Sequence, residues 1–323
     1  MRFLDAAAVH AALPFPPLVE ALREGHASLV KEIGRLLLEQ KTPAGADHFL
    51  IWAAWIEGAA VGAKLITVFP ANAGSGHPPI AAVYVLFDGA TGAPVAVLDG
   101  TALTLRKTAA DSALGADYLA RPDCRTLLVV GAGNQAPWQV GAMRAVRPGL
   151  ARVLVWNRTP AKAAALAAEM AATGLEARAV DDLAAAAAEA DLITCVTATR
   201  APVLRGEWLR PGTHVDLVGG FTTEMREADD EAIRRARVFA DTRRFTIGVC
   251  GDIDAPVRAG LLAEADIADL FDLAQGRAEG RRGADEITLF KNGGGGHLDL
   301  MSARLALSRH LEPHPGIRPG MHP

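Results

Sequence analysis

The stretch from Leu127 to Ala136 constrains the fold of this chain more than any other part of the sequence. An apolar run of strand character, Leu127–Val130, breaks into a turn that contains Gly131 and Gly133 and precedes a helix-forming segment. In a dinucleotide-binding turn, the first glycine permits the tight bend, the second lets the backbone approach a pyrophosphate, and a small third residue lets helix and strand pack closely. The turn therefore predicts a nucleotide site formed by Gly131, Gly133, Asn134, Gln135 and Ala136.

The next predicted strand, 152–156, ends where a Rossmann unit contacts the adenosine ribose of its cofactor. A cofactor without a 2′-phosphate calls for Asp or Glu at this point, whereas the chain has neutral Asn157 and cationic Arg158, followed by Thr159 and Lys162. A guanidinium can pair with a 2′-phosphate, so we favour NADP(H), with NAD(H) as the alternative. Thr159 also precedes a proline and would cap the next helix, and the two roles are compatible.

Strands and helices alternate from residue 126 to about residue 290, which is typical of a doubly wound parallel sheet. We expect the strands at 126–130, 152–156, 176–180, 191–196, 214–218 and 237–241. The fold class is therefore predicted as α/β, with a Rossmann-type parallel sheet and a second, β-rich domain for substrate binding and dimerisation. The expected ranges are 121–296 for the dinucleotide-binding domain, and 1–120 with 297–323 for the second domain.

The second domain is expected to contain a helix over residues 17–38, followed by four strands and a hairpin turn between the last two. The apolar stripe of that helix would be Leu18, Leu22, Leu29, Ile33 and Leu36. The expected strands are Phe49–Trp55, Gly62–Val68, Ala81–Asp88 and Pro94–Asp99. A helix over 104–118 follows, and a last helix over 297–310 is expected to return to this domain before a disordered tail.

The composition excludes several classes of partner. The net charge of −4 shows no basic surplus, so neither nucleic acid nor an anionic membrane is expected as a partner. Cys124, Cys195 and Cys250 have no metal-ligand spacing, and an odd number of scattered thiols fits a reducing compartment. We find no signal-peptide pattern and no apolar run of membrane-spanning length, so we expect a cytoplasmic protein without a metal site.

Several segments, in order along the chain, resemble the ornithine cyclodeaminase/mu-crystallin family. Besides the glycine turn, they are residues 64–70, 98–100, 104–110, 202–214 and 287–291. The resemblance extends from about residue 3 to residue 305 and implies a two-domain homodimer whose β-rich domain makes the dimer contact and holds the substrate. The family contains ornithine cyclodeaminases, ketimine and pyrroline-2-carboxylate reductases, alanine dehydrogenases and the crystallin, and its enzymes handle an α-amino or α-imino carboxylate beside a nicotinamide.

Such a substrate needs a cation for its carboxylate, and the resemblance assigns this role first to Lys64. Lys107 stands where the family usually has Arg; it keeps the charge but loses the bidentate fork. Its neighbour Arg106 is the alternative, because adjacent helical residues point about 100° apart and only one can face the site. Lys41 either corresponds to a further carboxylate-binding arginine of the family or is a plain surface lysine.

Phe221 marks the main departure from the family. Cyclodeaminases carry an Asp directly after the Val-Gly-Gly stretch, and phenylalanine can neither move a proton nor pair with an ammonium. We therefore expect a reductase that forms proline or pipecolate from a cyclic ketimine, with Phe221, Trp52 and Trp55 as an apolar wall. Lys64, His77 or a water would supply the proton. Ornithine cyclodeaminase, alanine dehydrogenase and a non-enzymatic NADPH-binding protein are the alternatives.

Four further positions are expected at the cofactor because ligands of open α/β sheets bind beyond the carboxyl ends of the strands. Thr197 and Val218-Gly219 follow two predicted strands, and Asn292 matches a family position that approaches the nicotinamide carboxamide. A glycine such as Gly219 also serves as a plain turn residue, so both roles stay open there.

Overall fold

The computed structural model describes residues 1–28, 32–42 and 45–311. The chain forms two compact units. The first unit consists of Met1–Pro14, Val30–Thr104 and Gly296–Pro323, and the second of Phe15–Leu29 and Leu105–Gly295. The last helix groups with the first unit and residues 105–120 group with the second, so the two compact units differ from the domain ranges expected from the sequence. Those functional domain boundaries stay a prediction.

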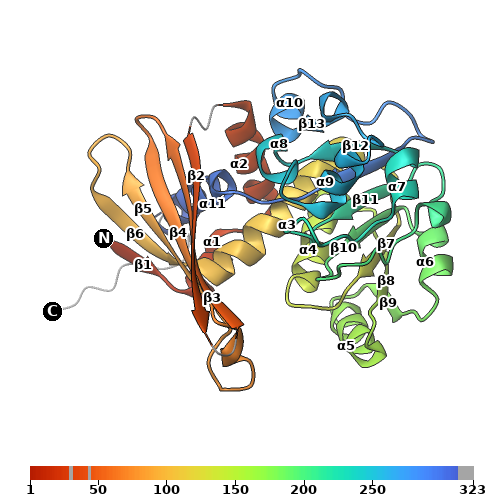
Figure 1. Ribbon diagram of the computed structural model, residues 1–323, viewed down its shortest axis with the longest axis horizontal. Helices are drawn as coiled ribbons and strands as arrows, with labels where there is room; N and C mark the ends of the chain where they lie inside the picture. Colours follow the sequence, from red (N-terminus) through yellow and green to blue (C-terminus); the bar gives the residue numbers. More distant parts are fainter. Residues whose placement is uncertain (29–31, 43–44, 312–323) are drawn as a thin grey trace. The chain divides into compact units, whose positions relative to one another are not determined.

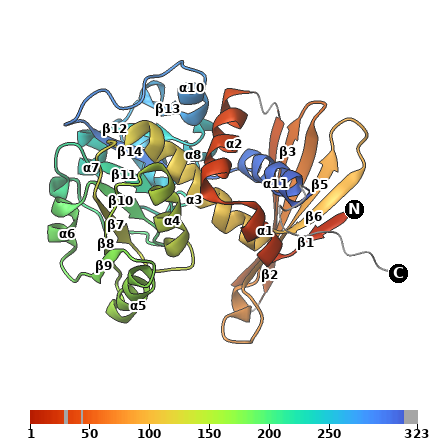
Figure 2. The ribbon, with the colours of Figure 1, turned by 180° about the vertical axis from the view of Figure 1, so that it is seen from behind.

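The first unit is built on a six-stranded sheet in the order β1-β6-β5-β4-β3-β2 (Figure 1). The strands are β1 (Arg2–Leu4), β6 (Pro94–Asp99), β5 (Ile80–Asp88), β4 (Ala60–Val68), β3 (Gly45–Ile56) and β2 (Glu32–Thr42). Strand β1 runs parallel to β6, and every other pair is antiparallel. Helix α11 (Gly296–Leu311) packs against β3, β4 and β5, and α1 (Ala6–Ala12) packs against α11, so one face of the sheet is covered (Figure 2).

The helix expected over residues 17–38 is wrong in its second half. Helix α2 spans Phe15–Ala27, and β2 begins at Glu32. The part of the apolar stripe that lies in α2 is buried, with Leu18 and Leu22 both 0% exposed. Beyond it, β2 pairs with β3 along its whole length, from Glu32↔Trp55 to Thr42↔Gly45. The hydrogen bonds between β2 and β3 therefore outweigh the helical spacing of the apolar residues. The spacing alone does not predict them, because they join segments that are apart in the sequence.

The second unit is built on an eight-stranded sheet in the order β13-β12-β14-β11-β10-β7-β8-β9, and all its pairs are parallel. The strands are β7 (Thr126–Val130), β8 (Arg152–Trp156), β9 (Glu176–Ala179), β10 (Leu192–Cys195), β11 (His214–Leu217), β12 (Ala236–Ala240), β13 (Ala268–Asp269) and β14 (Ile287–Lys291). The expected Rossmann-type sheet is confirmed. Its order β9-β8-β7-β10-β11 places a topological switch point between β7 and β10, where such sheets bind ligands.

Helices cover both faces of this sheet, because alternate strand residues enter two separate apolar cores. Leu127 and Val129 pack with Val140 and Met143 of α4 (Ala136–Val146), whereas Leu128 belongs to the core on the other face. The remaining helices are α2, α3 (Gly100–Leu119), α5 (Pro160–Ala171), α6 (Leu183–Glu189), α7 (Asp230–Arg235), α8 (Arg243–Thr246), α9 (Gly251–Arg258) and α10 (Leu270–Ala274). Within the described residues, no helix is both long enough and apolar enough to cross a membrane.

Candidate active site

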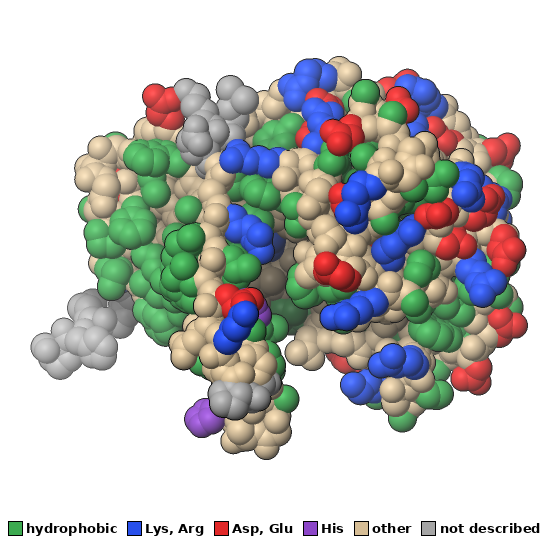
Figure 3. All heavy atoms as spheres, viewed as in Figure 1, with side chains coloured by type: hydrophobic (Ala, Val, Ile, Leu, Met, Phe, Trp, Pro, Cys, Tyr) green, Lys and Arg blue, Asp and Glu red, His purple; other side chains and the backbone are tan. Residues whose placement is uncertain are grey.

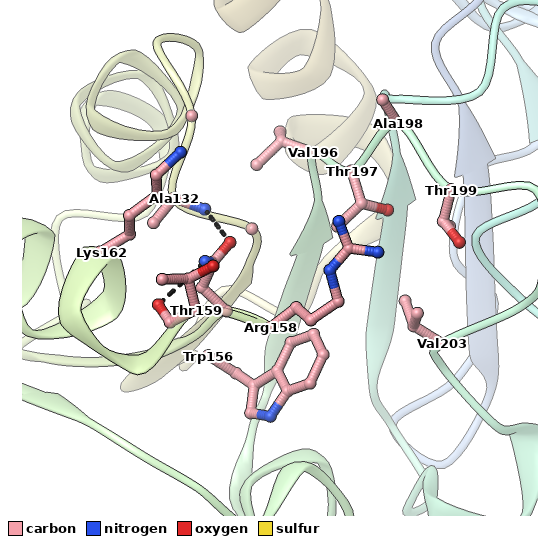
Figure 4. A pocket seen from close by; sticks show the side chains of 13 residues that line it. Ala132, Trp156, Arg158, Thr159, Lys162, Val196, Thr197, Ala198, Thr199 and Val203 are labelled. Atoms are coloured by element: carbon pink, nitrogen blue, oxygen red, sulfur yellow. Dashed lines mark hydrogen bonds between the residues drawn. The ribbon is translucent and has the colours of Figure 1, made fainter.

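A pocket of about 350 Å³ lies at the switch point of the parallel sheet (Figure 4). The expected glycine turn forms one side of it, and the segment that follows β10 forms another. Its lining residues are Gly131, Ala132, Gly133, Trp156, Asn157, Arg158, Thr159, Lys162, Val196, Thr197, Ala198, Thr199 and Val203. The lining contains two cations and no carboxylate, so the pocket favours an anionic ligand.

The two glycines of the turn serve different purposes. Gly131 has a φ of 111°, and a Cβ there would lie 2.9 Å from the carbonyl oxygen of Val196. A Cβ on Gly133 would meet nothing within 4 Å, so this position faces open space. The first glycine is therefore required by the fold, and the second leaves room for a group that approaches the backbone. These are the two features that a bound pyrophosphate needs.

The other residues predicted for the turn differ in placement. Asn134 is exposed, and Ala136 is fully buried as the first residue of α4. The side chain of Gln135 does not cap α4 but donates to the carbonyl oxygen of Leu105 at 3.1 Å. Gln135 therefore connects the turn to α3 in the same unit, and the first N–H groups of α4 have no side-chain cap. Free N–H groups at a helix start favour an anion.

At the end of β8, Asn157 supports the turn. Its Oδ1 accepts from the Ala132 N–H at 3.1 Å, and its Nδ2 donates to the carbonyl oxygen of Thr159 at 3.0 Å. Arg158 and Lys162 are exposed and line the pocket, and Figure 4 shows Arg158 extending toward Thr197. Thr159 occupies the N-cap position of α5, but its side chain makes no capping hydrogen bond. The cations, rather than Asn157, can pair with a phosphate.

The ends of β10 and β11 are closely apposed beside the pocket. A Cβ on Gly219 would lie 1.9 Å from the carbonyl oxygen of Thr197, so only glycine fits there. Val218, half-buried, continues the ladder by donating to the Cys195 carbonyl oxygen at 2.9 Å. Asn292 is 4% exposed, and its amide donates to Thr108 O and Ser112 Oγ, both at 3.0 Å. Its side chain thus braces α3 inside the second unit.

In the first unit, Lys64 forms a buried ion pair. It lies on β4, is 4% exposed, and its Nζ is 3.0 Å from Oδ1 and 2.9 Å from Oδ2 of Asp299 on α11. A longer contact of 3.4 Å joins Nζ to Thr104 Oγ1. Sequence reasoning identified the lysine but missed its partner Asp299, which lies 235 positions away in the chain.

Strand register identifies a cation that sequence reasoning missed. Arg35, Trp52, Lys64 and Tyr84 are directly opposite one another on β2, β3, β4 and β5, so their side chains share the α11 face of the sheet. The Arg35 guanidinium lies 5.6 Å from the centre of the Trp52 ring. Lys41 is exposed, six residues further along β2, which corresponds to roughly 20 Å. The sequence did not predict a role for Arg35, because the segment that contains it was expected to be a helix rather than a strand beside β3.

Lys107 and Arg106 point to different surroundings in the second unit. Lys107 is 4% exposed, and its Nζ lies 3.3 Å from where a Cβ on Gly294 would be. Its charge acts on two buried carboxylates: burial raises the pKa of Asp111 well above its usual value and that of Asp241 to about 7, and Lys107 opposes both shifts. Arg106 is half-buried and stacks over Trp138, with Cζ 4.6 Å from the ring centre.

The remaining predicted substrate residues are mostly exposed. Phe221 is 65% exposed after β11, and Trp55 is 51% exposed at the end of β3. His77 is exposed in the loop after β4, and the expected proton role of its ring stays a prediction. Trp55 and Trp52 lie three residues apart on one strand, so their side chains point to opposite faces of the sheet and cannot form one wall.

Three comparisons relate the chain to known proteins. The sequence profile of the ornithine cyclodeaminase/mu-crystallin family matches residues 12–312. The chain is 45% identical to a Δ(1)-pyrroline-2-carboxylate reductase of Paracoccus denitrificans over 94% of this chain and 95% of that one. Its fold is similar to that of Thermococcus litoralis Δ(1)-pyrroline-2-carboxylate reductase, solved with NADH and L-proline, with 30% identity, coverage of 96% and 98%, and a TM-score of 0.89. The iminosuccinate reductase of Paracoccus denitrificans, solved with NAD+, has 27% identity, 96% coverage of both chains and a TM-score of 0.86.

Proposed function

The chain belongs to the ornithine cyclodeaminase/mu-crystallin family, and from this premise we propose that it is an NAD(P)H-dependent reductase of cyclic ketimines. Its substrate would be Δ1-pyrroline-2-carboxylate, its six-membered homologue Δ1-piperideine-2-carboxylate, or both, and its products L-proline and L-pipecolate. The observation that carries this proposal is the 45% identity to a Δ(1)-pyrroline-2-carboxylate reductase over nearly the full length of both chains.

The nucleotide pocket fits the proposed cofactor, because a positive-φ Gly131, an open Gly133 and an uncapped helix start meet at its edge. When bound, a reduced nicotinamide supplies the hydride. The residues of the turn hold the pyrophosphate, Arg158 and Lys162 hold the adenosine end, and the strand ends at Thr197 and Gly219 support the nicotinamide end.

Lys64 and Arg35 hold the substrate carboxylate in our proposal, since they lie in one row of the sheet. The Lys64 ammonium has three N–H donors, and Asp299 and Thr104 already accept from it. The Thr104 contact, at 3.4 Å, is the longest, so a carboxylate oxygen replaces it most easily. Asp299 holds the Lys64 ammonium in place, and in our proposal Lys64 both binds the acid and donates the proton. The role of Lys107 as a second cation for the carboxylate stays a prediction from the family resemblance.

Phe221 favours reduction over cyclodeamination. Deamination with ring closure needs a base at this position to move protons to and from nitrogen, and loss of such a group commonly lowers the rate by about 10²–10⁴-fold. Phe221 offers only an exposed apolar ring after β11. Reduction of an imine requires less of the protein, namely orientation, charge and one proton. The alternative lyase activity would release ammonia from ornithine.

NADP(H) is our preferred coenzyme. Arg158 and Lys162 line the pocket at the end of β8, where a 2′-phosphate would meet two cations and no carboxylate. Two of the similar structures contain NADH or NAD+, which lack this phosphate. The preference therefore rests on these two side chains of this chain.

A homodimer is the proposed assembly. The sheet face opposite α11 carries Leu36, Leu38, Trp55 and Val83, which are 50%, 53%, 51% and 42% exposed. Figure 3 shows apolar side chains gathered over this sheet. A contiguous apolar surface of this kind marks a contact between chains, and a second copy would cover it with its own matching face.

A cytoplasmic location is part of the proposal. Cys124, Cys195 and Cys250 are all buried and free, and buried thiols of this kind persist in a reducing compartment.

The test combines a substrate panel with two matched variants of β2. The panel offers both ketimines, pyruvate with ammonia, and ornithine, each with NADPH and NADH. We expect oxidation of the reduced coenzyme with the ketimines, faster with NADPH. Arg35→Ala should raise the KM for the ketimine by about 10–100-fold, the effect of losing one charge-assisted hydrogen bond.

Lys41→Ala is the control, because it removes an equal charge from the same strand outside the Lys64 row. It should leave KM within about twofold of the parent value, a change well under 1 kcal/mol. Absence of turnover with both ketimines would overturn the proposed function, and a larger effect of Lys41→Ala than of Arg35→Ala would overturn the site.

A further inference from the structure

A buried carboxylate bridges the two strand ends beside the nucleotide pocket. Glu227 is 0% exposed and lies between β11 and α7. Its Oε1 accepts from the N–H and the hydroxyl of Thr197, at 2.7 and 2.8 Å, and its Oε2 accepts from the Gly219 N–H at 2.6 Å. One side chain therefore holds the backbone beyond both β10 and β11.

The hydrogen-bonded ladder between these two strands ends just before Thr197 and Gly219. Cys195 and Leu217 are the last paired residues of the two strands, and the Val218 N–H makes the final ladder bond to Cys195 O. Thr197 and Gly219 come next, and parallel strands diverge once their ladder ends. Glu227 links the two segments beyond this ladder, because it accepts from the hydroxyl and N–H of Thr197 and from the N–H of Gly219.

Asp252 and Lys291 hold the backbone of Glu227 in place. Its backbone N–H donates to Asp252 Oδ1 at 2.7 Å, and Lys291 Nζ donates to Asp252 Oδ2 at 3.1 Å. Lys291 and Asp252 are 0% and 1% exposed. Burial raises the pKa of Glu227 to about 7, and Lys291 and the Thr197 donors oppose this rise. The network thus places the Glu227 carboxyl group as an acceptor at a fully buried position.

We propose that Glu227 is a positioning residue of the cofactor site, which acts by fixing the backbone at Thr197 and Gly219. The inference rests on the proposed function, because Thr197 lines the pocket assigned to the dinucleotide. Glu227 does not itself line the pocket. Its effect on the cofactor passes through the two strand ends, and its loss should weaken binding without removing any contact with the ligand.

The sharpest variant is Glu227→Gln, which keeps the shape of the side chain. A carboxamide has one acceptor oxygen and one NH2 donor. Its NH2 group must therefore face the backbone N–H of either Thr197 or Gly219, from which it cannot accept. Whichever way the amide turns, either Thr197 or Gly219 loses its acceptor in a buried place. A buried donor left without a partner carries a penalty that corresponds to about a tenfold or larger change in an equilibrium constant.

Asp229→Ala is the matched control. Asp229 lies two residues further along, and its Oδ1 accepts from the N–H groups of Gly206 and Ala232 at 2.8 and 3.0 Å. It caps α7 and does not bond to either strand end. This variant should lower the melting temperature and leave cofactor affinity unchanged, which separates general destabilisation from positioning.

The measurement is the dissociation constant of NADPH and of NADH for the full chain, followed by the fluorescence of Trp156, which lines the pocket. We expect Glu227→Gln to raise both constants by about tenfold or more, and Asp229→Ala to change them by less than about twofold. If Glu227→Gln does not fold, Glu227→Asp replaces it, since a side chain shorter by one methylene cannot span both donors.

A Glu227 variant that folds and binds as tightly as the parent would overturn the inference and leave the proposed function intact. Equal weakening in Asp229→Ala would also overturn it, because the effect would then be one of stability. A parent chain that binds neither dinucleotide would overturn the proposed function, and the inference with it.

Discussion

At the scale of single residues, charge compensation governs the buried lysines. Lys64 and Lys291 are nearly or fully buried, and each is paired with a buried aspartate, Asp299 or Asp252. An unpaired ammonium would be strongly disfavoured in such a place, since burial opposes the charged form. Lys64, which we propose as a substrate cation, therefore also forms one half of a buried ion pair.

The Lys64–Asp299 pair yields a prediction about stability. Asp299→Asn should lower the free energy of unfolding by about 3–5 kcal/mol, because it leaves a buried ammonium without its counter-charge. The double variant Lys64→Met with Asp299→Leu should be less destabilised, since neither charge remains. Denaturant unfolding at one fixed protein concentration measures both values. A double variant at least as unstable as Asp299→Asn would show that the pair is not electrostatically coupled.

At the scale of elements, the turn between β7 and α4 divides two tasks between two glycines. Gly131 adopts a conformation that L side chains rarely take, and it contacts the segment after β10. Gly133 has neither constraint and faces open space. Gly131 is needed for the backbone conformation of the turn, and Gly133 leaves open space for the dinucleotide that we propose.

This division predicts opposite outcomes for two alanine variants. Gly131→Ala should cost about 1–3 kcal/mol of stability because the backbone there is strained for any residue with a Cβ. Gly133→Ala should leave stability within about 0.5 kcal/mol of the parent and weaken dinucleotide binding by about tenfold, or roughly 1.4 kcal/mol. Thermal unfolding without ligand and a fluorescence titration distinguish them. Parent-like affinity in Gly133→Ala would argue against a pyrophosphate at this turn.

At the scale of the whole molecule, the two faces of the six-stranded sheet differ in whether a helix covers them. Lys64 faces α11, which covers one side, whereas Leu36 and Val83 stand on the other side and are about half exposed. An apolar sheet face without a covering layer is unfavourable in water, and a second chain would provide that layer.

A charged pair of substitutions tests the proposed dimer. Leu36→Glu combined with Val83→Glu should convert the protein from dimer to monomer, because four carboxylates would meet at a self-complementary contact. Light scattering after size-exclusion chromatography measures the mass. Leu37→Glu, whose side chain lies on the opposite face of the same strand, is the control and should remain dimeric. A parent protein that elutes as a monomer would contradict the assembly.

The local sequence was sufficient for six of the eight strands of the parallel sheet and for its glycine turn, whereas β13 and β14 were not among the expected strands. Strand, glycine turn and helix succeed one another within about twenty residues, and the alternation of buried strands and helices repeats down the chain. Patterns of this kind arise from short-range preferences and burial period, which a single sequence displays directly. The same local logic failed at residues 32–38, where Ile33 and Leu36 continue a helical spacing but pairing with β3 makes a strand.

Only the tertiary structure decided which side chains work together. Lys64 and Asp299 are 235 positions apart in the chain, and no local pattern joins them. Arg35 lies in the same row as Lys64 because of the register of β2, β3 and β4. Glu227 accepts hydrogen bonds from Thr197 and Gly219, which follow β10 and β11. The sequence by itself determined the family and most elements of the parallel sheet, because these depend on neighbours along the chain. Charge pairing, strand register and bridging hydrogen bonds depend on neighbours in space, and these emerged only once the chain was folded.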